Sequence, residues 1–163
     1  MTQTNMATDA KTKQIKYFIW IQASPEDVYD LFATAEGLDS WFCTGSVVDL
    51  QHKQIEYRWK DWSGKRVSYS TGGAILEASR PHRFVFQWGQ PPSTIEFEFT
   101  PKDGGTYMTV LEYGYDESDD KSKANMMECA SGWGQALTMA KFYVEYGAVA
   151  KHPWPWKECK NPK

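Results

Sequence analysis

Between Val47 and Tyr113 the sequence alternates apolar and polar side chains, and short clusters of turn-forming residues interrupt the alternation. Phe97, for example, lies between Glu96 and Glu98. A period of two is typical of strands with one covered face and one solvated face. The turn clusters, DLQHKQ, WSGK, SRPHR, GQPPS and PKDGG, separate five or six strand candidates. The segment therefore predicts a meander of antiparallel strands, with Glu96 and Glu98 on its wet face.

The residues before this meander predict one strand and two short helices. QIKYFIWI alternates β-branched and aromatic residues and predicts a strand. In SPEDVYDLFATAEGLDSWF the apolar residues change to helical spacing, with Ser24 as N-cap, Pro25 in the first turn and Asp27 three residues after the cap. We expect Gly37 to separate this helix from a short second helix that ends near Trp41.

The last third of the chain predicts one long helix over most of SKANMMECASGWGQALTMAKFYVEY, with Gly147 as its stop. Gly132 and Gly134 flank Trp133, although glycine costs a helix interior about 0.5–1 kcal/mol relative to alanine. We therefore expect neighbouring backbone to approach closely at Trp133. The apolar stripe of the helix consists of Met126, Ala130, Trp133, Leu137, Ala140 and Val144.

Together these elements predict an α+β fold in which the sheet covers the helical stripe, because no other apolar surface is available. The 163 residues suit a single domain. We expect this domain over residues 14–148, between a disordered N-terminal tail (1–13) and an irregular C-terminal tail (149–163). With 8 Trp, 9 Tyr and 8 Phe, aromatic residues supply much of the apolar surface, as they do in cores and in ligand cavities.

Charge and cysteine content argue against several classes of protein. A net charge of −3 lacks the basic excess that nucleic-acid binding uses. Cys43, Cys129 and Cys159 have no paired spacing, which favours reduced thiols over a disulfide framework or a zinc site. The polar first residues do not resemble a signal peptide, and no apolar run is long enough to span a membrane. We expect a cytoplasmic protein without metal or cofactor.

Four pieces of the sequence, in this order, carry a family resemblance: ASPEDVYDLFATAEGLDSWF, GGAILEASRPHRFVFQW, GGTYMTVLEYGY and SGWGQALTMAKFYVEYG. Over residues 14 to 147 the chain resembles the START-like (SRPBCC) superfamily, and within it the family named after the activator of the ninety-kilodalton heat-shock protein ATPase. This resemblance implies a helix-grip fold: a curved antiparallel sheet of about six or seven strands, two short helices, and a long C-terminal helix across the sheet. It also implies a cavity between that helix and the sheet.

Aromatic residues and one carboxylate are the candidate lining of this cavity. Glu112 is at a strand position that carries a polar, cavity-directed residue in the resembling family, but its strand could present either face inward. Trp133 could likewise be a core anchor that leaves no open space. The candidate ligand-binding residues are Trp41, Phe42, Tyr57, Trp59, Trp88, Glu112, Trp133 and Leu137.

Aromatic lining without a catalytic constellation predicts binding of a small hydrophobic or aromatic molecule, without covalent chemistry. Two alternatives remain open. The family name suggests a chaperone partner, although the family's eukaryotic co-chaperones carry an additional N-terminal domain where this chain has a short tail. The superfamily also includes polyketide cyclases and dehydratases, in which Glu112 would be the acid or base. Phe142, opposite Trp133 on the helix, could mark a homodimer contact or pack under HPWPW.

Overall fold

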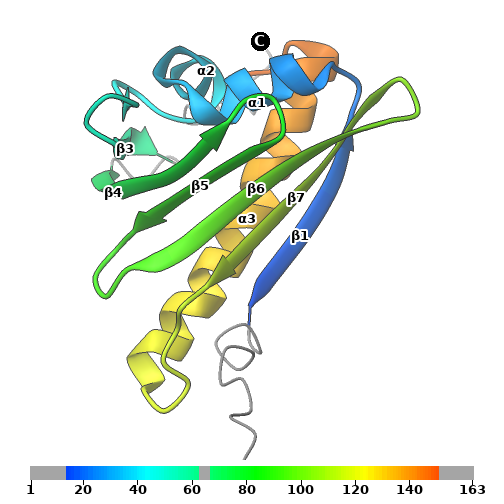
Figure 1. Ribbon diagram of the computed structural model, residues 1–163. Coiled ribbons are helices and arrows are strands. Elements are labelled where there is room, and N and C mark those ends of the chain that lie inside the picture. The colour runs from blue at the N-terminus through cyan, green and yellow to red at the C-terminus, as the bar shows by residue number, and fades with distance from the viewer. Residues whose placement is uncertain (1–13, 63–66, 151–163) are drawn as a thin grey trace, which may run out of the picture.

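The computed structural model describes residues 14–62 and 67–150, and in these ranges it contains seven strands and three helices. In chain order these are β1 (Ile15–Ile21), α1 (Pro25–Ala33), α2 (Ala35–Trp41), β2 (Val47–Asp49), β3 (Gln54–Trp62), β4 (Val67–Ser79), β5 (Arg83–Trp88), β6 (Ser93–Lys102), β7 (Gly105–Tyr113) and α3 (Asp120–Tyr146). The strands form one antiparallel sheet in the order β1-β7-β6-β5-β4-β3-β2. The sheet curves around α3, which crosses one of its faces, while α1 and α2 cover one end (Figure 1). This arrangement confirms the predicted helix-grip fold.

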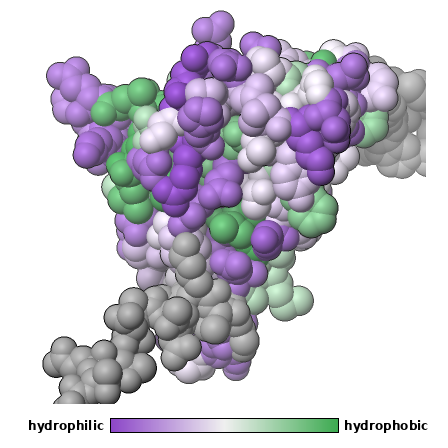
Figure 2. Space-filling view, turned by 45° about the vertical axis from the view of Figure 1, so that its right-hand side comes forward, coloured by the Kyte–Doolittle hydropathy of each residue, from purple (hydrophilic) through white to green (hydrophobic). Residues whose placement is uncertain are grey.

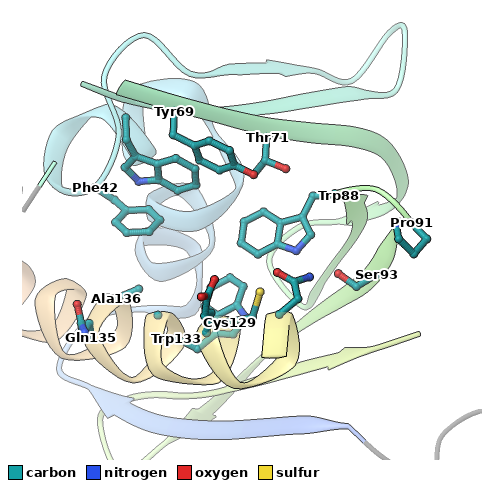
Figure 3. A pocket seen from close by; sticks show the side chains of 15 residues that line it. Phe42, Tyr69, Thr71, Trp88, Pro91, Ser93, Cys129, Trp133, Gln135 and Ala136 are labelled. Carbon is teal, nitrogen blue, oxygen red and sulfur yellow. The ribbon is translucent and has the colours of Figure 1, made fainter. Parts of the chain in front are cut away.

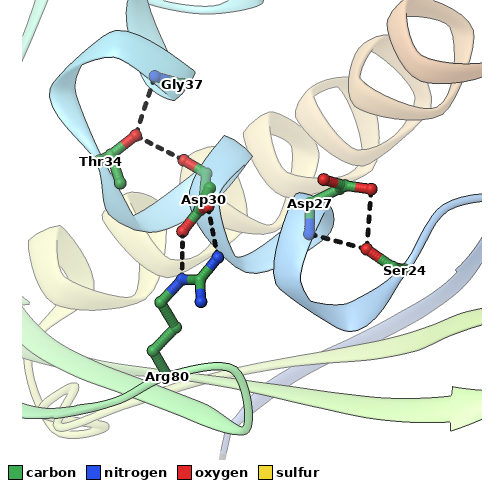
Figure 4. Close-up of polar contacts among 6 residues, drawn as sticks. All are labelled: Ser24, Asp27, Asp30, Thr34, Gly37 and Arg80. Carbon is green, nitrogen blue, oxygen red and sulfur yellow. Dashed lines mark hydrogen bonds and ion pairs between the residues drawn. The ribbon is translucent and has the colours of Figure 1, made fainter.

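The start of α1 agrees with the prediction, but the break before α2 does not. Ser24 Oγ accepts a hydrogen bond from the Asp27 backbone N–H at 3.1 Å (Figure 4). The break is at Thr34, which is extended and whose Oγ1 accepts from the Gly37 N–H at 3.0 Å. The prediction that Gly37 separates the helices was therefore wrong. Gly37 lies inside α2, where a Cβ would be 2.0 Å from the carbonyl oxygen of Asp30, so it permits the close packing of α2 on α1.

An ion pair joins α1 to the sheet. Arg80, in the turn between β4 and β5, donates from Nε and Nη2 to the two carboxylate oxygens of Asp30, both at 2.7 Å (Figure 4). This two-pronged geometry is the one that guanidinium and carboxylate groups favour. The hydrogen bond from Arg80 lowers the pKa of Asp30.

The limits of α3 also agree with the sequence pattern. The Asp119 carboxylate accepts from the Ser122 backbone N–H at 2.9 Å, which caps the N-terminus. Gly147 ends the helix in the left-handed conformation, at φ 67°, and its N–H donates to the carbonyl of Tyr143 at 2.9 Å. Of the predicted apolar stripe, three residues are buried and three are half-buried: respectively Trp133, Leu137 and Ala140, and Met126, Ala130 and Val144.

The inner face of β7 settles an alternative that periodicity left open. Met108, Val110 and Glu112 are all fully buried, whereas Thr109 and Leu111 between them are partly exposed. Glu112 therefore points into the space between the sheet and α3, and does not lie on the wet face. Its neighbours on this face are the aromatic and aliphatic residues of the core.

The outer face of the sheet carries the charged residues, with one correction. Glu98 is 53% exposed, as the alternation predicted. Glu96, which was predicted to be solvent-exposed, is only 5% exposed. Its burial is tolerated because Arg83 Nη2 at 2.8 Å and the Tyr113 hydroxyl at 2.5 Å both donate to its carboxylate. Burial, followed by this hydrogen bond, raises the pKa of Tyr113 to about 12. A second arginine of this face, Arg58, pairs with Glu56 in the same strand at 2.6 Å.

Apolar side chains are scattered among polar ones on the face that Figure 2 shows. Within residues 14–62 and 67–150, none of the helices is long and apolar enough to cross a membrane. The expected N-terminal tail, and the C-terminal tail from residue 151 on, lie outside the described residues.

Candidate functional site

A pocket of about 470 Å³ opens between the N-terminal half of α3 and strands β3, β4 and β5. This volume is within the range of small-molecule sites. In Figure 3, Cys129, Trp133, Gln135 and Ala136 come from α3, and Trp88 lies across from them. The lining consists of Phe42, Trp59, Tyr69, Thr71, Trp88, Gly89, Pro91, Ser93, Asn125, Glu128, Cys129, Gly132, Trp133, Gln135 and Ala136.

The structure brings four of the eight candidate residues together at this pocket. Phe42, Trp59, Trp88 and Trp133 belong to its lining. The other four do not line this pocket. They are buried behind it: Trp41, Tyr57, Glu112 and Leu137.

The three apolar members of this second group have ordinary core roles. Trp41 is 1% exposed and donates its indole N–H to the Leu31 carbonyl at 3.2 Å. Tyr57 stacks on Phe86, with ring centroids 5.6 Å apart. Leu137 lies on the buried face of α3. A helical or strand period identifies the covered face, but it does not distinguish filled space from open space on that face.

Glu112 is the centre of a buried hydrogen-bond network. Its Oε1 accepts from Trp88 Nε1 at 2.9 Å, from Ser93 Oγ at 2.6 Å and from the Tyr115 hydroxyl at 2.7 Å. Its Oε2 accepts from Trp133 Nε1 at 2.6 Å. An indole N–H can only donate, so each carboxylate oxygen has at least one obligate donor. Four donors on one carboxylate offset its loss of hydration on burial.

The charge of Glu112 acts on the groups around it. Burial raises the pKa of the Tyr115 hydroxyl, and the negative charge of Glu112 raises it further. Burial also raises the pKa of the Cys129 thiol, again with a second contribution from Glu112. The thiolate is the reactive form of cysteine, so Cys129 is a weak nucleophile although it lines the pocket.

Trp88 and Trp133 form the wall between Glu112 and the pocket. Their rings are stacked, with centroids 5.4 Å apart and planes at 21°. Trp133 also meets Phe97 edge to face at 5.5 Å and is 3% exposed. Trp133 therefore has both of the roles considered for it. It packs in the core, and it bounds an open pocket.

The two glycines beside Trp133 have a different role from the expected one. A Cβ at Gly132 would meet nothing within 4 Å, and Gly132 belongs to the pocket lining. A Cβ at Gly134 would meet only the Tyr17 ring, at an ordinary 3.7 Å. Neighbouring backbone does not approach Trp133 through either glycine, so that expectation was wrong. Gly132 instead leaves the pocket wider than any other residue would.

Sequence reasoning missed several residues of the site. Tyr69 stacks on Trp59 at 5.9 Å and faces the pocket, but it follows the WSGK turn cluster and belongs to no clear alternation. Ser93 comes from the turn GQPPS, and Tyr115 follows the end of β7. Each is positioned by a strand end, where local periodicity carries no signal.

Two buried polar atoms close to the pocket lack a hydrogen-bond partner among the described residues, namely the Tyr57 hydroxyl and Trp59 Nε1. Burial raises the pKa of Tyr57 well above its ordinary value. In the same described part of the chain, no three His, Cys, Asp or Glu residues are grouped so that they could hold a metal ion. His52, on the surface, contacts Asp49 at 2.7 Å.

Comparison with solved structures places this geometry in a known fold. The Aha1 dimer from Colwellia psychrerythraea matches at a TM-score of 0.66 and 20% identity, over 83% of this chain and 98% of that one. An AHSA1-like protein from Aeromonas hydrophila matches at 0.68 and 19% identity, over 87% and 99%. CalU16 from Micromonospora echinospora matches at 0.62 and 18% identity, over 82% and 77%. No curated protein matches this chain by sequence.

At the level of sequence, residues 22–145 match the family described as activator of Hsp90 ATPase homolog 1-like protein. The match covers most of the chain, from the end of β1 to the last turn of α3. It agrees with the resemblance that the four sequence pieces indicated. The chain therefore belongs to the family of activator of Hsp90 ATPase homolog 1-like proteins, within the START-like (SRPBCC) superfamily.

Proposed function

We propose that the protein binds a small hydrophobic or aromatic molecule in the pocket between α3 and the sheet, without covalent chemistry. The observation that carries the proposal is the pocket itself, about 470 Å³ lined by five aromatic side chains. Its fold is one that commonly binds ligands. Large aromatic surface with a few polar groups is typical of sites for apolar small molecules.

The geometry of Glu112 supports binding over catalysis. All four of its partners donate to it, and Trp88 and Trp133 stand between it and the pocket. A general base must reach the proton that it removes, at hydrogen-bond distance or through one water. We infer that Glu112 holds the pocket wall in place, and that a cyclase-like reaction would need another base.

Native mass spectrometry of freshly purified protein tests the proposal directly. We expect an added mass that is lost when the same sample is denatured, or, for protein without bound ligand, complex formation with a neutral naphthyl alcohol. The variant Gly132→Leu fills the pocket from α3 and should lose this complex while the fold remains, because a side chain there has free space.

Ser131→Leu is the matched control, since Ser131 is an exposed neighbour outside the pocket lining. It should bind as the unchanged protein does. Unfolding in urea verifies that both variants remain folded. Equal binding by both variants, or no complex under any of these conditions, would overturn the proposal.

A protein partner is a second candidate, supported by the family alone. The family description refers to an activator of a chaperone ATPase, and one solved relative is a dimer. We infer a chaperone or homodimer contact for this chain, with the exposed, neighbouring rings of Phe142 and Tyr146 on α3 as its surface. Analytical ultracentrifugation alone and with the chaperone tests both contacts. A monomer that sediments unchanged beside the chaperone would remove them.

A further inference from the structure

The charges around the pocket are of one sign. Among the described residues that line it, Glu128 is the only charged side chain, and no Lys, Arg or His is present. Behind the wall, the carboxylate of Glu112 is bound by neutral donors only. Neither carboxylate forms an ion pair with another of the described residues. The pocket therefore lies in a negative potential that a cation would lower.

The aromatic side chains add to this preference. Trp88 and Trp133 use their N–H groups for Glu112, so they offer the pocket ring carbon and not hydrogen-bond donors, and Trp88 supplies most of this surface because Trp133 is 3% exposed. The face of an aromatic ring carries negative charge density, and it attracts ammonium groups, most strongly in tryptophan. A hydrogen bond from the indole N–H to a carboxylate polarises the ring further in this direction.

We propose that the pocket selects an organic cation: an amine or quaternary ammonium on an aromatic or apolar body, with its charge against the indole faces and Glu128. This inference rests on the proposed function, because it names the chemical class of the ligand in the same pocket. Neutral molecules of the same shape bind more weakly, and carboxylates bind most weakly. An ammonium group loses hydration on entry, and the ring faces together with the carboxylate replace it.

Isothermal titration calorimetry with a matched series tests the selectivity: naphthylmethylammonium, its trimethylated form, naphthylmethanol and naphthoate. All four carry the same ring, so the differences report the polar group. We expect the ammonium to bind about three- to thirty-fold more tightly than the alcohol, from cation–π attraction and one exposed carboxylate. Added salt should narrow this difference, because it screens the charges.

Two variants separate the sources of the preference. Glu128→Gln should weaken ammonium binding about two- to five-fold and leave alcohol binding unchanged. Glu98→Gln removes the same charge from the outer face of the sheet and is the control, with no effect expected. Trp59→Leu, which leaves the Glu112 network intact, should weaken the cations more than the alcohol. The trimethylated form has no N–H, so its retained affinity would identify the ring faces as the binding surface.

Lys65 and Arg66 lie outside the described residues and follow β3 in the sequence. The series is therefore repeated on the double variant Lys65→Gln/Arg66→Gln, which should keep the same order of affinities. Naphthoate binding as tightly as the ammonium, in either protein, would overturn the proposal. Equal affinity for ammonium and alcohol would also overturn it, while leaving the proposed binding function in place. Failure of all four probes would overturn both.

Discussion

The two faces of the sheet each bury one glutamate, Glu112 on the inner face and Glu96 on the outer face, on neighbouring strands. Glu96 is bound by a guanidinium, that of Arg83, and by one hydroxyl. Glu112 is bound by two indoles and two hydroxyls, with no positive charge among these partners. One face neutralises its carboxylate, whereas the other only solvates it.

This difference shows how a buried charge can organise a site. A guanidinium cancels the field of Glu96, so its effect is local and structural. The donors of Glu112 leave its field largely in place, and three of them, Trp88, Ser93 and Trp133, line the pocket. The inner carboxylate therefore fixes the positions of Trp88 and Trp133 and sets the electrostatic character of the space in front of them.

Removal of the inner carboxylate should have the largest effect. Glu112→Leu leaves four donors without an acceptor, and we expect a loss of about 3–5 kcal/mol in the free energy of unfolding. Urea unfolding followed by circular dichroism measures this. Met108→Leu, four residues away on the same face, is a volume-conserving control that should cost less than about 1.5 kcal/mol. A loss for Glu112→Leu as small as the control's would show that the network does not stabilise the fold.

On the outer face, loss of the cation should cost less. Arg83 is 33% exposed, so Arg83→Met should lower the free energy of unfolding by about 1–2 kcal/mol, with solvent reaching Glu96. The double variant Arg83→Met/Glu96→Leu should be more stable than the single one, because it also removes the buried carboxylate that loses its cation, while the more exposed Glu77 and Glu98 lose Arg83 in both variants. A double-mutant cycle gives the coupling energy. Strictly additive losses would contradict the pairing.

The hydroxyl partner of Glu96 gives a smaller effect that depends on pH. Tyr113→Phe should cost about 0.5–1.5 kcal/mol at neutral pH through the lost hydrogen bond. Because the folded pKa of Tyr113 is raised from 10.0 to about 12, its contribution is complete below pH 10 and is lost as pH rises through 12. The stability difference between the two proteins should therefore shrink over that range. A difference that is constant up to pH 12 would contradict the raised pKa.

The smallest effect should come from Asp30, a surface carboxylate that is paired but exposed. Asp30→Asn should lower stability by about 0–1 kcal/mol. Arg80 lowers the pKa of Asp30, so the contribution is present above its ordinary pKa of 3.8 and is lost as pH falls through the lowered folded value. Thermal unfolding from pH 7 to pH 2 measures this. A loss of stability as large as that of Arg83→Met would show that the Glu96–Arg83 pair gains no extra stability from its greater burial than the Asp30–Arg80 pair has.

The sequence predicted the elements of the fold better than the junctions between them. Ser24, Pro25 and Gly147 act through local backbone geometry, which the residue type itself specifies, and their roles were correctly predicted. Gly37 was misassigned because the need for glycine at this position comes from the carbonyl of Asp30 in another helix. Such contacts between elements leave no periodic signal.

The same limit applies to the candidate site. Phe42, Trp59, Trp88 and Trp133 could be proposed from their aromatic type and position. The face of Glu112, by contrast, depends on donors that are distant in sequence, from β5 to α3. Both alternations of its strand mix apolar and polar residues, so only the assembled donors show why a carboxylate is tolerated there.

The stacked indoles of Trp88 and Trp133 lie on two different elements, a strand and the helix that covers it. Rings with centroids 5.4 Å apart share their electronic excitation, which splits their absorption and gives a paired positive and negative band in circular dichroism. This coupling falls with the cube of the distance between the rings. The amplitude of this paired band therefore reports the distance between α3 and β5.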